Sequence, residues 1–237
     1  DLWRSIKDQA KLEVCDMGIY LAVEAGLCAL GIVVMVFVHM FSNEASYFPI
    51  GSMIAALAVL CLILFGGIFS LGMGFDVAVS MGRTRKLYLP SAFIVYFILT
   101  LVLMTGLFLL LRVETAIYGV VLPGKIKDSI PIMTEFTVPW IFGASAAMTG
   151  CTALGAAVVR RFRRGKIVLL AVWLLACWTL PGATDGRNEN ILDRMGNAWG
   201  QWFAGFQTWA QISMLVGVGV IFCVTAYLLF RKQAVQW

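Results

Sequence analysis

The chain has 237 residues, of which 61% are hydrophobic and 13% are charged, and its mean hydropathy is +0.89. A soluble domain is about half apolar and a quarter charged, so this composition excludes a single water-facing globule. At about 20 residues per crossing of a roughly 30 Å hydrocarbon layer, the chain has room for several membrane helices. It has no room for a separate soluble catalytic domain of about 100 residues. We therefore expect an all-α, polytopic membrane protein with one transmembrane domain.

Residues 1–16 predict an amphipathic helix that lies at the membrane interface. Its apolar stripe is Trp3, Ile6, Ala10 and Val14, and its polar side carries Arg4, Lys7 and Lys11. This pattern is typical of interfacial helices, and Trp3 favours docking at the interface over a plain basic tail. The charged start does not match a cleavable signal peptide, so we expect the hydrophobic run that follows to remain in the membrane.

Six long apolar runs predict six transmembrane helices, because lipid offers no hydrogen-bond partner to an open backbone. They cover residues 17–40, 48–75, 89–111, 136–159, 167–181 and 208–230. The fifth run is at the lower limit of length for a crossing.

The distribution of basic residues predicts the orientation of these helices. Of the 18 Lys and Arg residues, all but five fall in segments on the same side as the N-terminus. The five are Arg112, Lys125, Lys127, Arg187 and Arg194. The positive-inside rule then predicts that both termini are cytoplasmic. The net charge of +5 does not indicate a nucleic acid partner, because the charges cluster at the ends of the apolar runs.

Two outer segments are long enough to have structure of their own. Residues 113–135 contain Pro123 and Pro131 and predict an irregular loop. Residues 183–207 begin polar and become aromatic. The aromatic residues recur at the spacing of one helix face, and they are Trp199, Trp202, Phe203 and Phe206. We expect this aromatic half to lie in the outer interface or to dip back into the membrane. A simple aromatic anchor for the sixth helix explains the spacing equally well.

The fourth apolar run is rich in small residues. Gly143, Ala147, Cys151 and Gly155 recur every four residues, beside Ala146 and Gly150. Such a face lets helix backbones approach closely, which favours intramembrane packing, including packing between subunits. The basic stretch at residues 160–166 that follows is a topology signal, and it can also contact anionic lipid headgroups.

Glu24 is the acidic residue deepest within a predicted span, about two turns from its cytoplasmic end. An ionised group at that depth costs on the order of a few kcal/mol, so Glu24 should face other helices, water or a cation. It is either a buried, hydrogen-bonded carboxylate, which we prefer, or part of the lining of a substrate or proton cavity.

No metal site is expected, because the six cysteines are scattered and the single histidine, His39, has no nearby carboxylate cluster.

Residues 76–88 are the polar connection between the second and third runs. Asp76 is placed to cap a short helix that starts at Val77, and Gly82 permits a sharp turn. Three basic residues, Arg83, Arg85 and Lys86, hold this loop in the cytoplasm. By themselves, these features indicate an ordinary inner loop.

The order of an amphipathic helix, two spans, an inner loop F-D-x-x-x-S-M-G-R-T-R-K-x-Y and four further spans resembles the permease subunits of ABC-2 type (type V) exporters. The resemblance extends over essentially the whole chain. The residues that carry it are Ser80, Met81, Gly82, Arg83, Thr84, Arg85 and Lys86, where that family often shows S-x-G-x-S/T-R-K.

This resemblance implies a transmembrane half-transporter that lacks an ATPase site of its own. Residues 77–86, beginning with Val77, would form a coupling helix that docks on a separate cytoplasmic ABC ATPase, which binds ATP and Mg²⁺. Two permeases, as a homodimer, would assemble with two ATPases. Residues 1–16 would be the connecting helix and residues 183–207 the outer re-entrant region. The cavity walls would come from the first, second and fifth spans.

A narrower similarity is to the permeases that export phenol-soluble modulins and antimicrobial peptides from Gram-positive bacteria. It implies an amphipathic or hydrophobic substrate, such as a peptide, toxin or drug, and a location in the bacterial plasma membrane. The sequence has no phosphate-binding loop and no nucleotide-binding fingerprint, so we expect no cofactor in this chain.

Two other functions remain open from the residues alone. One is a membrane enzyme that uses Glu24, His39 and Asp76, which would have to meet within hydrogen-bond reach. The predicted topology instead places His39 and Asp76 at opposite faces of the membrane. The other is a non-transporting membrane subunit, such as a peptide-binding or immunity protein.

Overall fold

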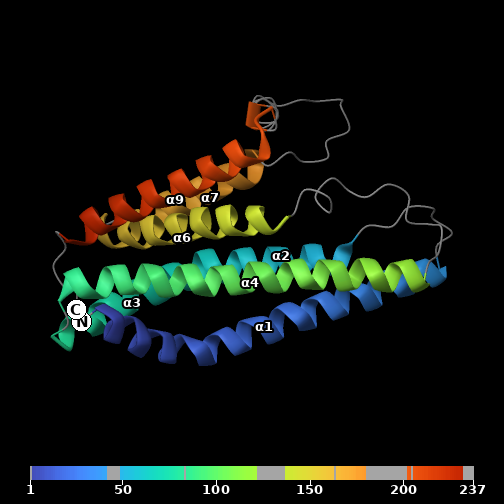
Figure 1. Cartoon of the computed structure of the whole chain (residues 1–237), viewed down its shortest axis with the longest axis horizontal. Coiled ribbons are helices and arrows are strands. Elements are labelled where there is room, and N and C mark those ends of the chain that lie inside the picture. Colours follow the sequence, from blue (N-terminus) through green and yellow to red (C-terminus); the bar gives the residue numbers. More distant parts are fainter. Residues whose placement is uncertain are drawn as a thin grey trace.

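The structure is a computed structural model of the chain, and it describes residues 2–41, 49–82, 84–121, 137–162, 164–179, 202–203 and 205–231. These residues form helices and turns, and no strand occurs among them. The helices are α1 (Leu2–Phe41), α2 (Ile50–Cys61), η1 (Leu62–Gly66), α3 (Gly67–Ser80), α4 (Arg85–Val121), α6 (Val138–Arg161), α7 (Gly165–Thr179) and α9 (Thr208–Arg231) (Figure 1). The prediction of an all-α chain is confirmed.

Five helical segments in the described part of the chain are long and apolar enough to cross a membrane. They are Asp16–Val38, Ile50–Ser80, Arg85–Val121, Val138–Arg161 and Thr208–Arg231. Each coincides with one of the predicted runs, so a multi-pass membrane protein is supported by length and composition. The fifth predicted run coincides with α7, which has 15 described residues and is too short to count as a span on this measure.

The predicted amphipathic helix is not a separate element. Residues 2–16 are the first part of α1, a single helix of 40 residues that continues into the first span. This part of α1 packs on the start of α4 through a polar face: the Ser5 and Ser91 hydroxyls lie 3.0 Å apart, and the Ser91 hydroxyl donates to Gln9 Oε1 at 3.0 Å. Of the predicted apolar stripe, Trp3 is 75% exposed and Val14 is exposed, whereas Ile6 and Ala10 are half-buried.

The second span is one continuous rod made of α2, η1 and α3, and its middle segment η1 is a π-helix. In a π-helix the backbone hydrogen bonds skip one more residue than in an α-helix. The neighbouring helix α6 supplements the backbone bonding here, because the Thr152 hydroxyl donates to the carbonyl of Ile63 at 3.2 Å. A buried hydroxyl at this point satisfies a polar group that lipid could not.

Helix α4 is longer than predicted. The expected irregular loop at residues 113–135 is wrong for its first part, because α4 continues to Val121. The reason is packing against α2, since Glu114 and Tyr118 are buried on the side of α4 that faces it. The remainder of that predicted loop, residues 122–135, lies outside the described residues.

Small residues let α6 and α9 touch through their backbones. A Cβ atom added to Gly150 would lie 2.6 Å from the carbonyl oxygen of Gly219, so neither position has room for a side chain. Gly143 also faces α9, whereas Gly155 faces Ile68 of α3. The predicted close packing of the fourth run is therefore confirmed, and it occurs within one chain.

Ends of five helices meet at one end of the bundle, on the left in Figure 1. The start of α1 contacts the start of α4 through Ser5 and Ser91. The end of α3 contacts the end of α6, and Arg85 at the start of α4 donates to the carbonyl of Arg231 at the end of α9. Helices α1 and α4 run away from this end, whereas α3, α6 and α9 run towards it.

Candidate functional site

The connection between α3 and α4 is a tight turn, which we call the basic turn (residues 77–86). Helix α3 ends at Ser80, residues 81 and 82 turn, and α4 begins at Arg85. Gly82 has φ +78°, a left-handed conformation that favours glycine, and its N–H donates to the Val79 carbonyl at 3.1 Å. The predicted sharp turn at Gly82 is confirmed.

The basic turn presents apolar side chains outward. Met81 is 77% exposed and Val77 is 56% exposed. The other exposed residues of the turn are Ser80, Gly82, Thr84 and Lys86, whereas Arg85 is half-buried and Arg83 lies outside the described residues. The turn is built from the last turn of α3 and the first turn of α4, and Val77 does not start a new helix.

Asp76 does not cap a helix, so the predicted cap is wrong. It lies inside α3, and its carboxylate accepts two hydrogen bonds from the guanidinium of Arg160 on α6, one of them at 2.7 Å. Arg160 also donates to the carbonyl of Gly72, and its guanidinium lies 5.0 Å from the centre of the Phe75 ring. The Arg160 side chain is 10% exposed and that of Asp76 is 32% exposed, so this bidentate pair is partly shielded from water.

The ring of Phe75 is the centre of a cluster that joins four helices. Phe75 is fully buried, its centroid lies 5.0 Å from that of Phe230 on α9, and the Tyr88 ring of α4 lies edge-on at 6.3 Å. The Arg85 guanidinium lies 5.9 Å from the same ring. Together with Arg160 on α6, these contacts lock the end of α3 to its neighbours.

A cavity of about 190 Å³ lies between α1, α3 and α4, beside the basic turn. Its lining consists of Gln9, Glu13, Ser70, Gly74, Val77, Ala78, Met81, Tyr88 and Tyr96. Burial raises the pKa of the Glu13 carboxyl above its ordinary value of 4.5, the charge of Asp16 raises it further, and a hydrogen bond with Ser70 opposes the shift. We call this space the inner cavity.

Glu24 is fully buried between α1 and α4, as expected for a carboxyl that faces other helices. It is not among the residues that line the inner cavity. The expected hydrogen bonds are missing: neither carboxyl oxygen has a hydrogen-bond partner among the described residues. The carboxyl group lies against Gly106, where an added Cβ would be 3.2 Å from Oε2 and 3.4 Å from Oε1.

A second fully buried glutamate, Glu114, was missed because the sequence placed it in a loop. Its carboxylate accepts hydrogen bonds from the N–H of Gly51 at 3.0 Å and the N–H of Ser52 at 2.7 Å, at the start of α2. The Ser52 hydroxyl and the Tyr118 hydroxyl also donate to it. Glu114 therefore caps α2 from another helix, where Pro49 offers no side-chain cap.

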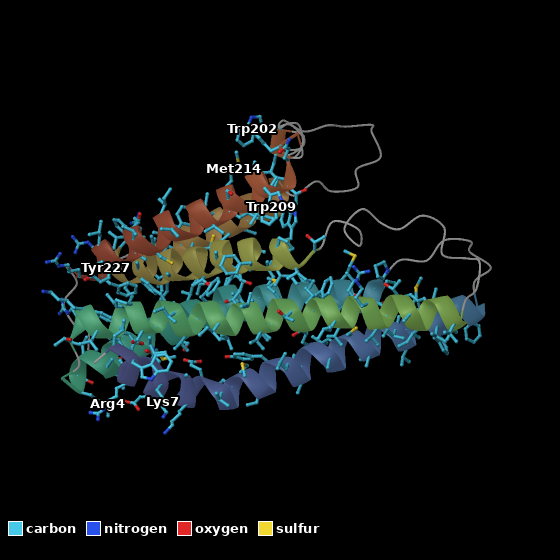
Figure 2. The ribbon with its side chains drawn as sticks, in the orientation of Figure 1. Arg4, Lys7, Trp202, Trp209, Met214 and Tyr227 are labelled. Carbon is cyan, nitrogen blue, oxygen red and sulfur yellow. The ribbon has the colours of Figure 1, made fainter. Side chains whose placement is uncertain are left out.

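The described aromatic residues Trp202, Phe203 and Phe206 lie at the end of α9 that is away from the basic turn. Figure 2 shows Trp202 and Trp209 there, and Arg4 and Lys7 near the bundle end that carries the basic turn. The ring of Trp202 contacts that of Phe206 at 4.8 Å, and Phe203 contacts Trp140 of α6 at 6.0 Å. Of the four aromatic residues at helical spacing, Trp202 and Phe206 are thus in contact, and Trp199 lies outside the described residues.

The described residues contain no group of three or more potential metal ligands. His39 lies 15 residues beyond Glu24 in the same helix, about 22 Å along its axis, and Asp76 is bound to Arg160. A catalytic site made of these three residues is therefore not assembled. Comparison of the chain with protein-family models, with curated proteins and with solved structures found no match.

Proposed function

We propose that this chain is the membrane-embedded permease subunit of an ABC-2 type exporter that a separate cytoplasmic ATPase drives. The observation that carries the proposal is the construction of the basic turn. It exposes Val77 and Met81 at the bundle end where basic residues gather, and contacts of Arg85 and of the adjoining Asp76 tie it to the ends of α9 and α6. Exposed apolar side chains with a polar surround suit a protein partner.

The contacts of the basic turn transmit a movement of the ATPase to the membrane helices. A force on residues 77–86 acts directly on α3 and α4, because the turn consists of their ends. The Asp76–Arg160 pair carries the movement to α6, and the Phe75–Phe230 contact carries it to α9. Packed contacts of this kind move as rigid bodies, which is how a transporter can expose a cavity to alternate sides.

The proposal includes six crossings with both termini in the cytoplasm of a bacterium. Helix α7 supplies the additional crossing, returning from the basic end beside α6. The described residues of the basic stretch, Arg160, Arg161, Arg164 and Lys166, lie at the same end as the basic turn. The positive-inside rule makes that end cytoplasmic. A second copy of the chain completes the pathway for an amphipathic or hydrophobic substrate.

The proposal is tested by recovery of the ATPase with the tagged chain. We compare the natural protein with the double variant Met81→Glu, Lys86→Glu, whose two side chains are exposed on the basic turn. The matched control is Arg161→Glu, Arg164→Glu, which reverses exposed charges at the other turn of the same bundle end. Each protein is purified from the membranes of its native cells, and any nucleotide-binding subunit that comes with it is quantified.

We expect the turn variant to lose the ATPase at least about tenfold, because the central side chain of an interface often contributes about 2 kcal/mol or more. The control variant should retain it. If the natural protein brings no ATPase, the exporter proposal fails, and a non-transporting membrane subunit becomes the better explanation. Equal loss in both variants would mean that the basic turn is not the docking surface.

A further inference from the structure

We propose that Glu24 is a proton-binding site within the seam between α1 and α4. The site depends only on these two helices and the small space beside them, so it does not require that a separate ATPase drives the protein. Its ligand is a proton delivered through water from the end of the bundle that carries the basic turn.

Two glutamates are fully buried in the described part of the chain, and their surroundings are opposite. Glu114 is 0% exposed, but two backbone N–H groups and two hydroxyls donate to its carboxylate, so its negative charge is compensated. Glu24 is also 0% exposed, and no donor among the described residues reaches either oxygen. A carboxylate without donors is unstable in an apolar site and takes up a proton.

The packing around Glu24 is apolar and leaves room for a carboxyl group. Gly106 on α4 has no side chain, so the two oxygens lie directly against the backbone of the facing helix. Leu21 of α1 lies against the same glycine. Glu24 is eight residues into the Asp16–Val38 span, which is about 12 Å along the helix axis and beyond the reach of the headgroups.

Among the described side chains of the surrounding helices, no cation compensates Glu24. The titratable groups on α1 within one turn are Tyr20 and Cys28, and those of α4 on the same side are Tyr96 and Glu114. Helix α2 contributes only the thiol of Cys61. The described cation on the outer part of α4, Arg112, is exposed and lies 5.1 Å from the Phe108 ring.

The inner cavity and a small void beside it extend from the basic turn towards Glu24, which lines neither of them. Tyr96 lines the inner cavity and also a small void of about 10 Å³, large enough for about one water molecule. The same void is lined by Tyr20, which lies one turn before Glu24 on α1. A proton entering past Glu13 therefore meets hydroxyl groups and room for water on the way to Glu24.

The chemical step is a simple exchange. The Glu24 carboxylate takes one proton from a hydronium ion, which becomes water, and the reverse step releases the proton to water. With the proton bound, a neutral side chain fits the apolar seam and α1 packs against α4. Without it, the seam holds an uncompensated negative charge, which admits water between the two helices.

Infrared spectroscopy of the full chain in lipid vesicles tests the site. We expect a carbonyl stretch of a protonated carboxylic acid near neutral pH, which disappears in Glu24→Gln and remains in Glu114→Gln. Gly106→Ala keeps the carboxyl group and adds a methyl next to it, so it should shift the same band. This variant provides a readout even if Glu24→Gln fails to fold. A carbonyl band that survives in Glu24→Gln and does not move in Gly106→Ala would overturn the proposal. Absence of the band from the natural protein would overturn it as well.

Cys28 reports whether the seam opens when the proton leaves. Its side chain is 1% exposed and lies one turn beyond Glu24. With the other five cysteines replaced by alanine, we expect a water-soluble maleimide to modify Cys28 at least tenfold faster at alkaline pH in the natural background than in Glu24→Gln. The comparison at one pH removes the intrinsic pH dependence of the thiol. Equal rates would show that the seam does not open on loss of the proton.

Discussion

At the scale of single residues, Glu13 links the stability of the protein to pH. Burial raises the pKa of its carboxyl group, so the folded state favours the protonated form more than the unfolded state does. The folded protein therefore gains most from Glu13 below its ordinary pKa of 4.5, and this gain is lost as pH rises through the raised pKa.

We predict that Glu13→Gln removes this loss. The variant should be no less stable than the natural protein in acid, and more stable once pH has risen past the raised pKa. The measurement is thermal unfolding in detergent across that pH range, read as the difference between the two proteins. Asp16→Asn should move the change to lower pH, because the charge of Asp16 contributes to the shift. A difference that is constant with pH would contradict the prediction.

Local features of the site followed from the sequence, and long-range partners did not. The sharp turn at Gly82 was predictable because a left-handed conformation is almost restricted to glycine in such a position. The burial of Glu24 was predictable from its depth in an apolar run. The partner of Asp76 is 84 residues away, and that of Glu114 is 62 residues away at Ser52. No local pattern indicates pairs at that separation.

At the scale of helices, the contact between α6 and α9 should tolerate no side chain at its centre. We predict that Gly219→Ala destabilises the protein by about 1–3 kcal/mol, because the new methyl group would overlap the backbone of α6. Gly217→Ala is the matched control, since an added Cβ there has no neighbour within 4 Å. It should be neutral or stabilising by up to about 1 kcal/mol. Unfolding in detergent gives both values, and equal effects would contradict the prediction.

The positions of the helices were predictable from hydropathy, but several of their ends were not. Five of the six predicted runs coincide with helices long enough to cross a membrane. Hydropathy indicates which residues can lie in the membrane interior, and it does not indicate where a helix ends. Residues 2–16 continue α1 because Ser5 and Gln9 find partners on α4. Residues 112–121 continue α4 because Glu114 binds the start of α2.

At the scale of the whole molecule, the proposed six crossings can be tested with short epitope tags. We predict that tags at both termini and after Thr84 are inaccessible from outside intact cells, and that tags after Lys127 and Arg187 are accessible. The positive-inside rule sets this orientation.

The tag after Arg187 decides the role of α7. A tag after Arg164, at the start of α7, serves as its control and should be inaccessible. If the tag after Arg187 is also inaccessible, α7 does not cross the membrane and the six-crossing proposal is wrong.

The π-helix η1 determines which neighbouring helices the two halves of the second span pack against. One additional residue per turn rotates everything after η1 by about 100° relative to a regular α-helix. Before η1 the rod packs on α1, with Gly51 of α2 lying against the Cys28 carbonyl. From η1 onward it packs on α6, through Thr152 and the Asp76–Arg160 pair. The first half of the rod thus packs mainly on α1 and the second half mainly on α6, and a one-residue deletion in η1 would put these two contacts out of phase.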